Sequence, residues 1–330
     1  MRLYRRLLII ATLLAFAVIA LGAYVRLSDA GLGCPDWPGC YGQLLGVPAA
    51  AHEQAAARQA FPGQPVEPHK AWKEMAHRYL AASLGVLIVL IALLAWRYRR
   101  ALRQSPSLPT LLVAVVIAQA LLGMWTVTLL LKPLIVSAHL LGGMSTLALL
   151  VWLLLRQHAP QENTAAARDL RALAALALLA VIVQIALGGW VSSNYAALAC
   201  SDFPTCQGGW WPEMDFAQAF ALHRELGQGA DGALLANAAL TAIHWAHRVG
   251  ALAVAAIVGA LALALSRRPR WRRWAALLAA ILLAQLALGV ANVLLALPLT
   301  LAVAHNAGAA VLLSVTLALN FRLRQSPCRR

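Results

Sequence analysis

Charged residues are scarce in this sequence. Asp, Glu, Lys and Arg make up only 12% of its 330 residues, and 62% are hydrophobic, whereas a water-soluble domain carries about 25% charged and about 45–50% apolar residues. So few charges exclude a soluble globular protein of this size. The same composition excludes a disordered chain, a disulfide-rich miniprotein and a collagen-like fibre. The class that remains is a polytopic membrane protein.

Other features are missing as well. The net charge is +15, but nucleic-acid binding requires a basic face or an aromatic-basic module, and the sequence has neither, so no nucleic-acid partner is expected. Without a Cys-x-x-Cys-His motif, covalent attachment of a c-type haem is not indicated. No small-residue cleavage site follows the first apolar run and no Ser-rich transit peptide precedes it. We therefore expect a retained first helix and a bacterial inner membrane.

Long apolar runs are abundant. A membrane-spanning helix needs about 20 mainly apolar residues, and eight stretches qualify: 7–25, 75–96, 109–131, 133–155, 172–193, 243–265, 274–296 and 298–321. Very short links around Pro133 and Pro298 join span three to span four and span seven to span eight. Both links are predicted to be tight turns.

The basic residues predict the orientation. Most Lys and Arg residues lie before span one, after spans two, four and six, and at the end of the chain, which places these segments and both termini in the cytoplasm. Two long loops, about 26–72 and 194–240, then lie outside. Each ends in an amphipathic segment, such as 216–226, predicted either to lie on the membrane surface or to cap the helices as a solvated helix.

The two halves of the chain resemble each other. Motifs in the first half recur 166 residues later, including the Cys-x5-Cys pairs that start at Cys34 and Cys200, and His139 with His305. Each half holds four spans, an even number, so both cross the membrane in the same direction. We predict an all-α protein of two four-helix bundles, residues 1–160 and 161–330, related by a pseudo-two-fold axis along the membrane normal.

Five histidines lie in the spans. His77, His139, His244, His247 and His305 all sit near the outer ends of even-numbered spans, and polar groups at such depth are usually functional. Each ring has the alternative of bonding a neighbouring helix. Zinc is disfavoured because no Cys, Asp or third His joins either repeat-related pair. Two neutral imidazoles in an apolar setting suit the axial positions of a haem iron.

Small residues near the histidines have two interpretations. They allow either a flat macrocycle or a neighbouring helix to approach the backbone. They are Gly85, Gly142, Gly143, Gly250, Ala304, Ala307 and Gly308.

The halves differ at one informative position beside the histidines. Glu74 stands three residues before His77, where the second half has His244 before His247. Glu74 therefore shares a helix face with His77, either as a general base or as a solvated residue at the helix start. Arg78 and Arg248 follow these histidines and are candidates for pairing with haem propionates or for reaching lipid headgroups.

Four cysteines lie in the outer loops. Because the outer face of a bacterial inner membrane is oxidising, we predict the disulfides Cys34–Cys40 and Cys200–Cys206. Their role is either a structural clip or, for the first pair, redox chemistry. Cys328 is left as a free thiol.

Several motifs, in order over essentially the whole chain, resemble the haem A synthase family. They include Cys-Pro-Asp-Trp-Pro at 34–38, Glu-Met-Ala-His-Arg at 74–78, Gly-Met-Trp-Thr-Val at 123–127 and His-Trp-Ala-His-Arg at 244–248. The resemblance implies two fused four-helix bundles and oxidation of a methyl group of haem O to the formyl group of haem A, by successive hydroxylations and loss of water.

The resemblance also implies residue roles. His77 and His139 flank the substrate haem, Glu74 is the acid-base residue, and His247 and His305 ligate a prosthetic haem b. Candidate partners are the lipid bilayer, haem O synthase and oxidase assembly factors, and an oligomer is compatible with the sequence.

Two other functions use the same histidines. One is a diheme b-type membrane cytochrome that passes electrons without modifying haem, and the other is a haem transporter or chaperone. Glu74 favours the enzyme, because an electron-transfer site needs no carboxylate on its ligand face.

Overall fold

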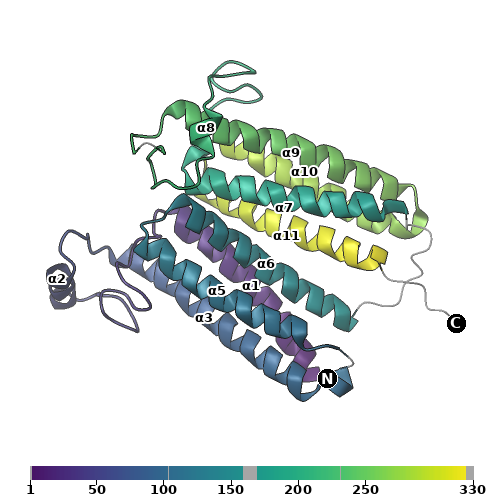
Figure 1. Ribbon diagram of the computed structural model, residues 1–330, viewed down its shortest axis with the longest axis horizontal. Coiled ribbons are helices and arrows are strands. Elements are labelled where there is room, and N and C mark those ends of the chain that lie inside the picture. Colours follow the sequence, from purple (N-terminus) through teal and green to yellow (C-terminus); the bar gives the residue numbers. More distant parts are fainter. Residues whose placement is uncertain (1, 103, 159–168, 231, 325–330) are drawn as a thin grey trace. The chain divides into compact units, whose positions relative to one another are not determined.

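The structure, a computed structural model, describes residues 2–102, 104–158, 169–230 and 232–324. Within them, eight helices are long and apolar enough to cross a membrane. Figure 1 shows how these long helices are arranged within each part of the chain. The predicted number of spans and the all-α class are confirmed. The helices are α1 (Arg2–Leu27), α3 (Pro68–Arg97), α5 (Ser107–Thr128), α6 (Pro133–His158), α7 (Arg171–Ser193), α9 (Asn237–Ser266), α10 (Arg272–Leu294) and α11 (Leu299–Arg324).

The contacts between residues divide the chain into two compact units, Met1–Thr146 with Arg224–Leu226, and Leu147–His223 with Gly227–Arg330. In the first unit, α3 packs against α1 and α5; in the second, α9 and α11 each pack against both α7 and α10. The boundary predicted near residue 160 lies outside the described residues and stays a prediction.

Two helices begin earlier than their hydropathy predicts. α3 starts at Pro68 and α9 at Asn237, although neither helix has a side-chain cap. Proline in the first turn of α3 is favourable there. Glu74 consequently lies inside α3 and is only 5% exposed. The alternative that Glu74 is a solvated residue at a helix start is therefore wrong.

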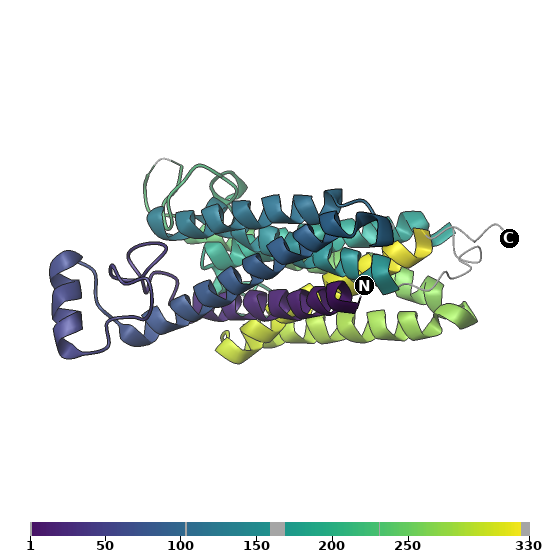
Figure 2. The same ribbon diagram turned by 90° about the horizontal axis from the view of Figure 1, so that it is seen from below.

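Short helices occupy the connecting segments: α2 (Ala51–Ala60), α4 (Arg99–Leu102), η2 (Ala196–Leu198), α8 (Phe216–Ala219) and η3 (Pro269–Trp271). In Figure 2, α2 stands apart from the ends of α1 and α3. The amphipathic segment predicted at 216–226 is helical only to Ala219. Its chain turns back beyond that residue, and the side-chain oxygen of Gln218 accepts a hydrogen bond from the backbone of Ala230 at 2.9 Å.

The backbone repeats with the offset seen in the sequence. Non-glycine residues with positive φ occur as pairs 166 residues apart: Asp29 and Tyr195, Tyr41 and Gln207, Leu130 and Ala296, and Leu131 and Leu297. The last two pairs form the turns before Pro133 and Pro298. Leu131 N donates to Thr126 O at 2.8 Å, and Leu297 N donates to Asn292 O at 2.7 Å. Both predicted tight turns are confirmed.

Candidate functional site

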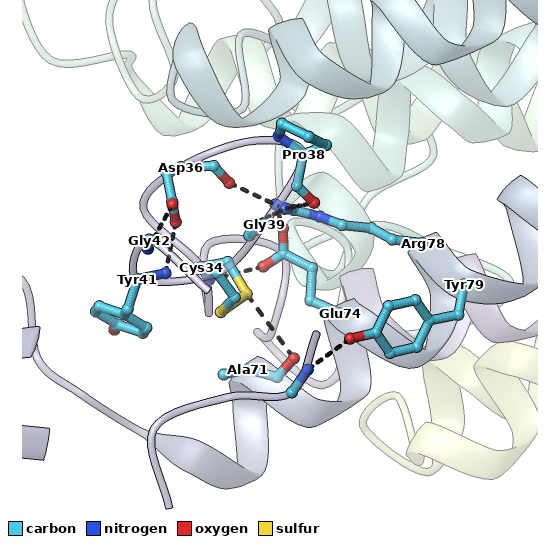
Figure 3. The surroundings of a disulfide bond; sticks show 12 residues. Cys34, Asp36, Pro38, Gly39, Tyr41, Gly42, Ala71, Glu74, Arg78 and Tyr79 are labelled. Atoms are coloured by element: carbon cyan, nitrogen blue, oxygen red, sulfur yellow. Dashed lines mark hydrogen bonds and ion pairs between the residues drawn. A yellow bond between two sulfur atoms is a disulfide. The ribbon is translucent and has the colours of Figure 1, made fainter. Parts of the chain in front are cut away.

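Glu74 joins the first outer loop to α3. One carboxylate oxygen accepts a hydrogen bond from the backbone N–H of Cys34 at 2.9 Å, and the other pairs with Arg78 one helical turn away (Figure 3). Gly33 makes this approach feasible, since a Cβ atom there would lie 2.7 Å from the backbone carbon of Lys70. The carboxylate is thus buried, paired and held at the base of the disulfide loop.

Arg78 holds the same loop from the other side. Its Nη1 donates to the backbone carbonyls of Asp36 at 2.9 Å, Pro38 at 3.2 Å and Gly39, as Figure 3 shows. Carbonyl oxygens carry no side-chain signature, so sequence reasoning missed these partners. Pairing of Arg78 with a haem propionate receives no support from these contacts and stays a prediction.

The second unit repeats this arrangement with histidine in place of glutamate. Arg248 donates to the carbonyls of Cys200 at 3.0 Å, Asp202 at 2.8 Å and Thr205 at 2.7 Å. Its Nε donates to Nε2 of the buried His244 at 3.1 Å. The Nδ1 of His244 lies 3.1 Å from the carbonyl oxygen of Ala196. His244 therefore links Arg248 to the loop, as Glu74 links Arg78, and the sequence alone had given it no role.

Both predicted disulfides are confirmed, Cys34–Cys40 and Cys200–Cys206. Each encloses an aspartate that accepts hydrogen bonds from the backbone N–H groups just after the second cysteine. Asp36 accepts from Tyr41 at 2.6 Å and Gly42 at 2.7 Å. For Asp202, the hydroxyl of Thr205 together with two backbone N–H groups lowers the pKa to about 2. The loops are compact because their own backbone is tied down from within.

Four of the intramembrane histidines rest against glycines. At each such glycine an added Cβ would lie 2.9–3.3 Å from the ring Cε1, so the helices approach closely there because the side chain is missing. The pairs are Gly22 with His77, Gly123 with His139, Gly188 with His247, and Gly289 with His305. These glycines lie on the odd-numbered spans and set the position of each ring.

The members of each predicted pair lie in the same unit, His77 and His139 in the first and His247 and His305 in the second. Each ring of a pair is within electrostatic range of the other, and their joint binding of one iron stays a prediction. The Nδ1 atoms of His77, His139 and His305 are buried without a hydrogen bond of normal geometry to any described residue. Such polar atoms are costly unless they serve a ligand.

The donor set fits a haem better than a bare metal ion. No cluster of three or more His, Cys, Asp or Glu side chains able to hold a metal is found in the described part of the chain. A structural zinc site needs four ligands, whereas a haem iron, already held by four porphyrin nitrogens, needs only two axial imidazoles. The paired histidines therefore suit haem.

Three of the glycines suggested as openings for a macrocycle are filled by glutamine side chains. Added Cβ atoms at Gly142, Gly250 and Gly308 would overlap Gln119, Gln184 and Gln285 respectively. Gly85 instead faces Val116. At these four glycines the structure therefore shows contact with a side chain of a neighbouring helix, which was the alternative interpretation. The glutamines lie four residues before the glycines that touch the histidines, a spacing from which sequence reasoning had not identified a function.

These features define a multi-pass helical membrane protein with paired histidines in two repeated units, each below a disulfide loop. Residues 5–317 match a family described as cytochrome oxidase assembly protein. The chain belongs to this family.

Curated relatives support that membership over the full length. A heme A synthase from Shewanella oneidensis is 44% identical over 321 residues, which is 96% of this chain and 95% of the relative. A heme A synthase from Caulobacter vibrioides is 28% identical over 345 residues, again 96% and 95%. One from Methylobacterium sp. is 31% identical over 336 residues, 95% and 90%.

Proposed function

We propose that this protein is a membrane oxidoreductase that converts haem O into haem A by oxidising a methyl group to a formyl group. The family and the relative at 44% identity support this assignment. The observation that carries it is the buried carboxylate of Glu74, which stands three residues before His77 and is replaced by His244 in the second repeat. The two repeats thus differ in having a carboxylate at this position in the first and an imidazole in the second.

The substrate site is assigned to the first unit. His77 and His139 flank the haem O, and Glu74 lies on the same face of α3, one turn before His77. The carboxylate already accepts from Cys34 and Arg78, but each oxygen has a second lone-pair direction. Held by these two partners, Glu74 is positioned to accept a proton during methyl oxidation without swinging away from the site.

The prosthetic site is assigned to the second unit. His247 and His305 would hold haem b, and the group supplies electron transfer when bound. Here His244 occupies the position of Glu74 and ties Arg248 to the loop. No carboxylate is needed, because electron transfer moves no proton at a substrate carbon. Arg248 and Arg78 remain candidates for propionate binding, which would require each guanidinium to give up loop carbonyls.

The membrane arrangement follows from the basic residues. We place the protein in a bacterial inner membrane, with both termini cytoplasmic and the haem sites on the periplasmic side. The repeated turns and loops support a division into N-terminal and C-terminal four-helix bundles, residues 1–160 and 161–330. Haem O synthase and oxidase assembly factors are the proposed partners, together with the lipid that delivers a long-tailed substrate.

A diheme cytochrome is the second candidate. Histidine pairs in both units favour it, as does the ion pair that gives Glu74 a structural role. Pigment extraction separates the two functions. Protein purified from a host that makes haem O is extracted with acidified acetone, and the haems are resolved by chromatography. We expect haem A and haem O beside haem b; haem b alone, with haem O supplied, would establish the cytochrome.

A further inference from the structure

Three of the four haem-ligand candidates share a glutamine that the fourth lacks. Gln119, Gln184 and Gln285 each pack from the preceding span onto a glycine three residues after a histidine. The combinations are Gln119 on Gly142 after His139, Gln184 on Gly250 after His247, and Gln285 on Gly308 after His305. In each case the two helices make two such contacts. A glycine of the first helix touches the histidine ring of the second, and one turn further on a glutamine of the first helix packs on a glycine of the second.

Two of the three amide groups, those of Gln184 and Gln285, bond the histidine main chain. Nε2 of Gln184 donates to the carbonyl oxygen of His247 at 2.9 Å and lies 3.1 Å from its Nδ1. Nε2 of Gln285 donates to the carbonyl oxygen of His305 at 2.7 Å. Each bond ties the turn that carries the ring to the neighbouring helix.

These glutamines are not there for packing alone. The Oε1 atoms of Gln184 and Gln285 are buried and find no hydrogen-bond partner among the described residues. Burial of an unpartnered amide oxygen destabilises the folded protein. An apolar residue avoids that cost, as the fourth site demonstrates.

At His77 the support is missing. The residue four before Gly22 is Val18, and the residue three after His77 is Leu80. The side chain of Val18 has no hydrogen-bond donor. Leu80 fills the space that a glycine would leave for a longer side chain from the neighbouring helix. The glycine contact with the ring is retained, so this site keeps the ring in place without a glutamine side chain.

We propose that Gln119, Gln184 and Gln285 are positioning residues that fix His139, His247 and His305, and that His77 is the ligand free to rearrange. The proposal rests on the proposed function: a substrate haem must enter and its product must leave, whereas a prosthetic haem stays. Exchange is therefore assigned to the His77 side of the first unit: amide bonds from Gln184 and Gln285 hold His247 and His305, and the packing of Gln119 on Gly142 holds His139.

The first test removes a tether. In the purified holoprotein, Gln184→Leu is expected to raise the rate of haem b loss to excess apomyoglobin about fivefold, the effect of losing one net hydrogen bond. It also shifts the ferric low-spin EPR signal, which depends on the angle between the two imidazole planes. Gln285→Leu should do the same, and Gln54→Leu, in the short helix α2, should change neither quantity.

The second test installs a tether. Val18→Gln with Leu80→Gly gives the first site the pattern of the other three. We expect release of haem from that site to slow severalfold, while the haem b signal is unchanged. An unaltered release rate would overturn the assignment of His77 as the exchanging ligand.

The outcomes separate this proposal from the proposed function. If haem A forms normally but the Gln184→Leu and Gln285→Leu variants keep wild-type EPR signals and haem retention, the positioning role is wrong and the enzyme assignment stands. If these variants lose haem b faster but no haem A is ever extracted, the tethers stand and the protein is the cytochrome. If Gln184→Leu does not fold, Gln184→Met keeps the side-chain length and removes the hydrogen-bond donor.

Discussion

Nε of Arg248 donates a hydrogen bond to Nε2 of His244 at 3.1 Å. In the first half of the chain the equivalent arginine, Arg78, pairs with Glu74 instead. Both arginines bind the carbonyl oxygens of a disulfide loop. The two halves thus share the arginine–loop contact and differ in the residue that pairs with the arginine, Glu74 or His244. This difference allows structural and chemical roles to be tested separately.

His244 is expected to be structural. His244→Ala removes its bonds to Arg248 and Ala196 and leaves a cavity under the second loop, which should lower the free energy of unfolding by about 1–3 kcal/mol. Thermal unfolding of the purified protein measures this change. Haem A yield per folded molecule should stay at the wild-type level; its loss would give His244 a part in the chemistry.

Glu74 is expected to be catalytic. Glu74→Gln keeps an acceptor oxygen for the N–H of Cys34 but cannot take up a proton at neutral pH, so the protein should fold and bind haem while haem A formation stops. Extracted pigments measure the result. The matched control is Glu67→Gln, at the start of α3, which should leave the yield unchanged. A wild-type yield of haem A from Glu74→Gln would remove Glu74 from the mechanism.

The second histidine pair is expected to bind haem b. His247→Ala or His305→Ala leaves one axial ligand, and the low-spin haem b spectrum should disappear in both variants. Reduced-minus-oxidised absorption of the isolated protein checks this. Cys328→Ser serves as a control that leaves the spectrum intact. Retention of the low-spin spectrum in either histidine variant would assign the iron to other ligands.

Arg78 is expected to protect the first disulfide. Arg78→Gln loses the charge-assisted bonds to three loop carbonyls, so the loop opens more often and reduction of Cys34–Cys40 should become about tenfold faster. Thiol labelling during incubation with a membrane-impermeant reductant follows the reaction. The Cys200–Cys206 disulfide of the same molecule is the internal control. Equal rates of Cys34–Cys40 reduction in wild type and variant would contradict a protective role of Arg78.

Asp202 makes the second loop sensitive to acid. Bonds from Thr205 and from backbone N–H groups lower its pKa from 3.8 to about 2, so the ionised carboxylate is favoured by folding. Its contribution is complete above about pH 4 and is lost as the pH falls towards 2. The protection of the Gln207 and Gly208 amides against hydrogen exchange, corrected for the pH dependence of the intrinsic rate, should fall over that range. Asp202→Asn should remove the pH dependence; an unchanged profile in this variant would exclude Asp202 as its cause.

Much of the fold was predictable because membrane-spanning helices are recognisable in a sequence as long apolar runs. The eight spans, the turns before Pro133 and Pro298, and both disulfides follow from apolar runs, short links and the repeat. Helix starts were less accessible, since hydropathy measures the apolar part of a helix and α3 and α9 extend beyond it. The prediction of an amphipathic helix at 216–226 was wrong beyond Ala219, where contacts with the rest of the loop override the local sequence pattern.

The sequence by itself determined the class of protein, the repeat and the histidines that lie in the spans, because composition and spacing are properties of the chain. Only the tertiary structure decided what the arginines, His244 and the glutamines contact. Their partners are backbone carbonyls and glycine surfaces on other segments, which have no side chain to mark them. Such contacts exist only once the helices have packed, since packing alone brings a donor on one segment to an acceptor on another.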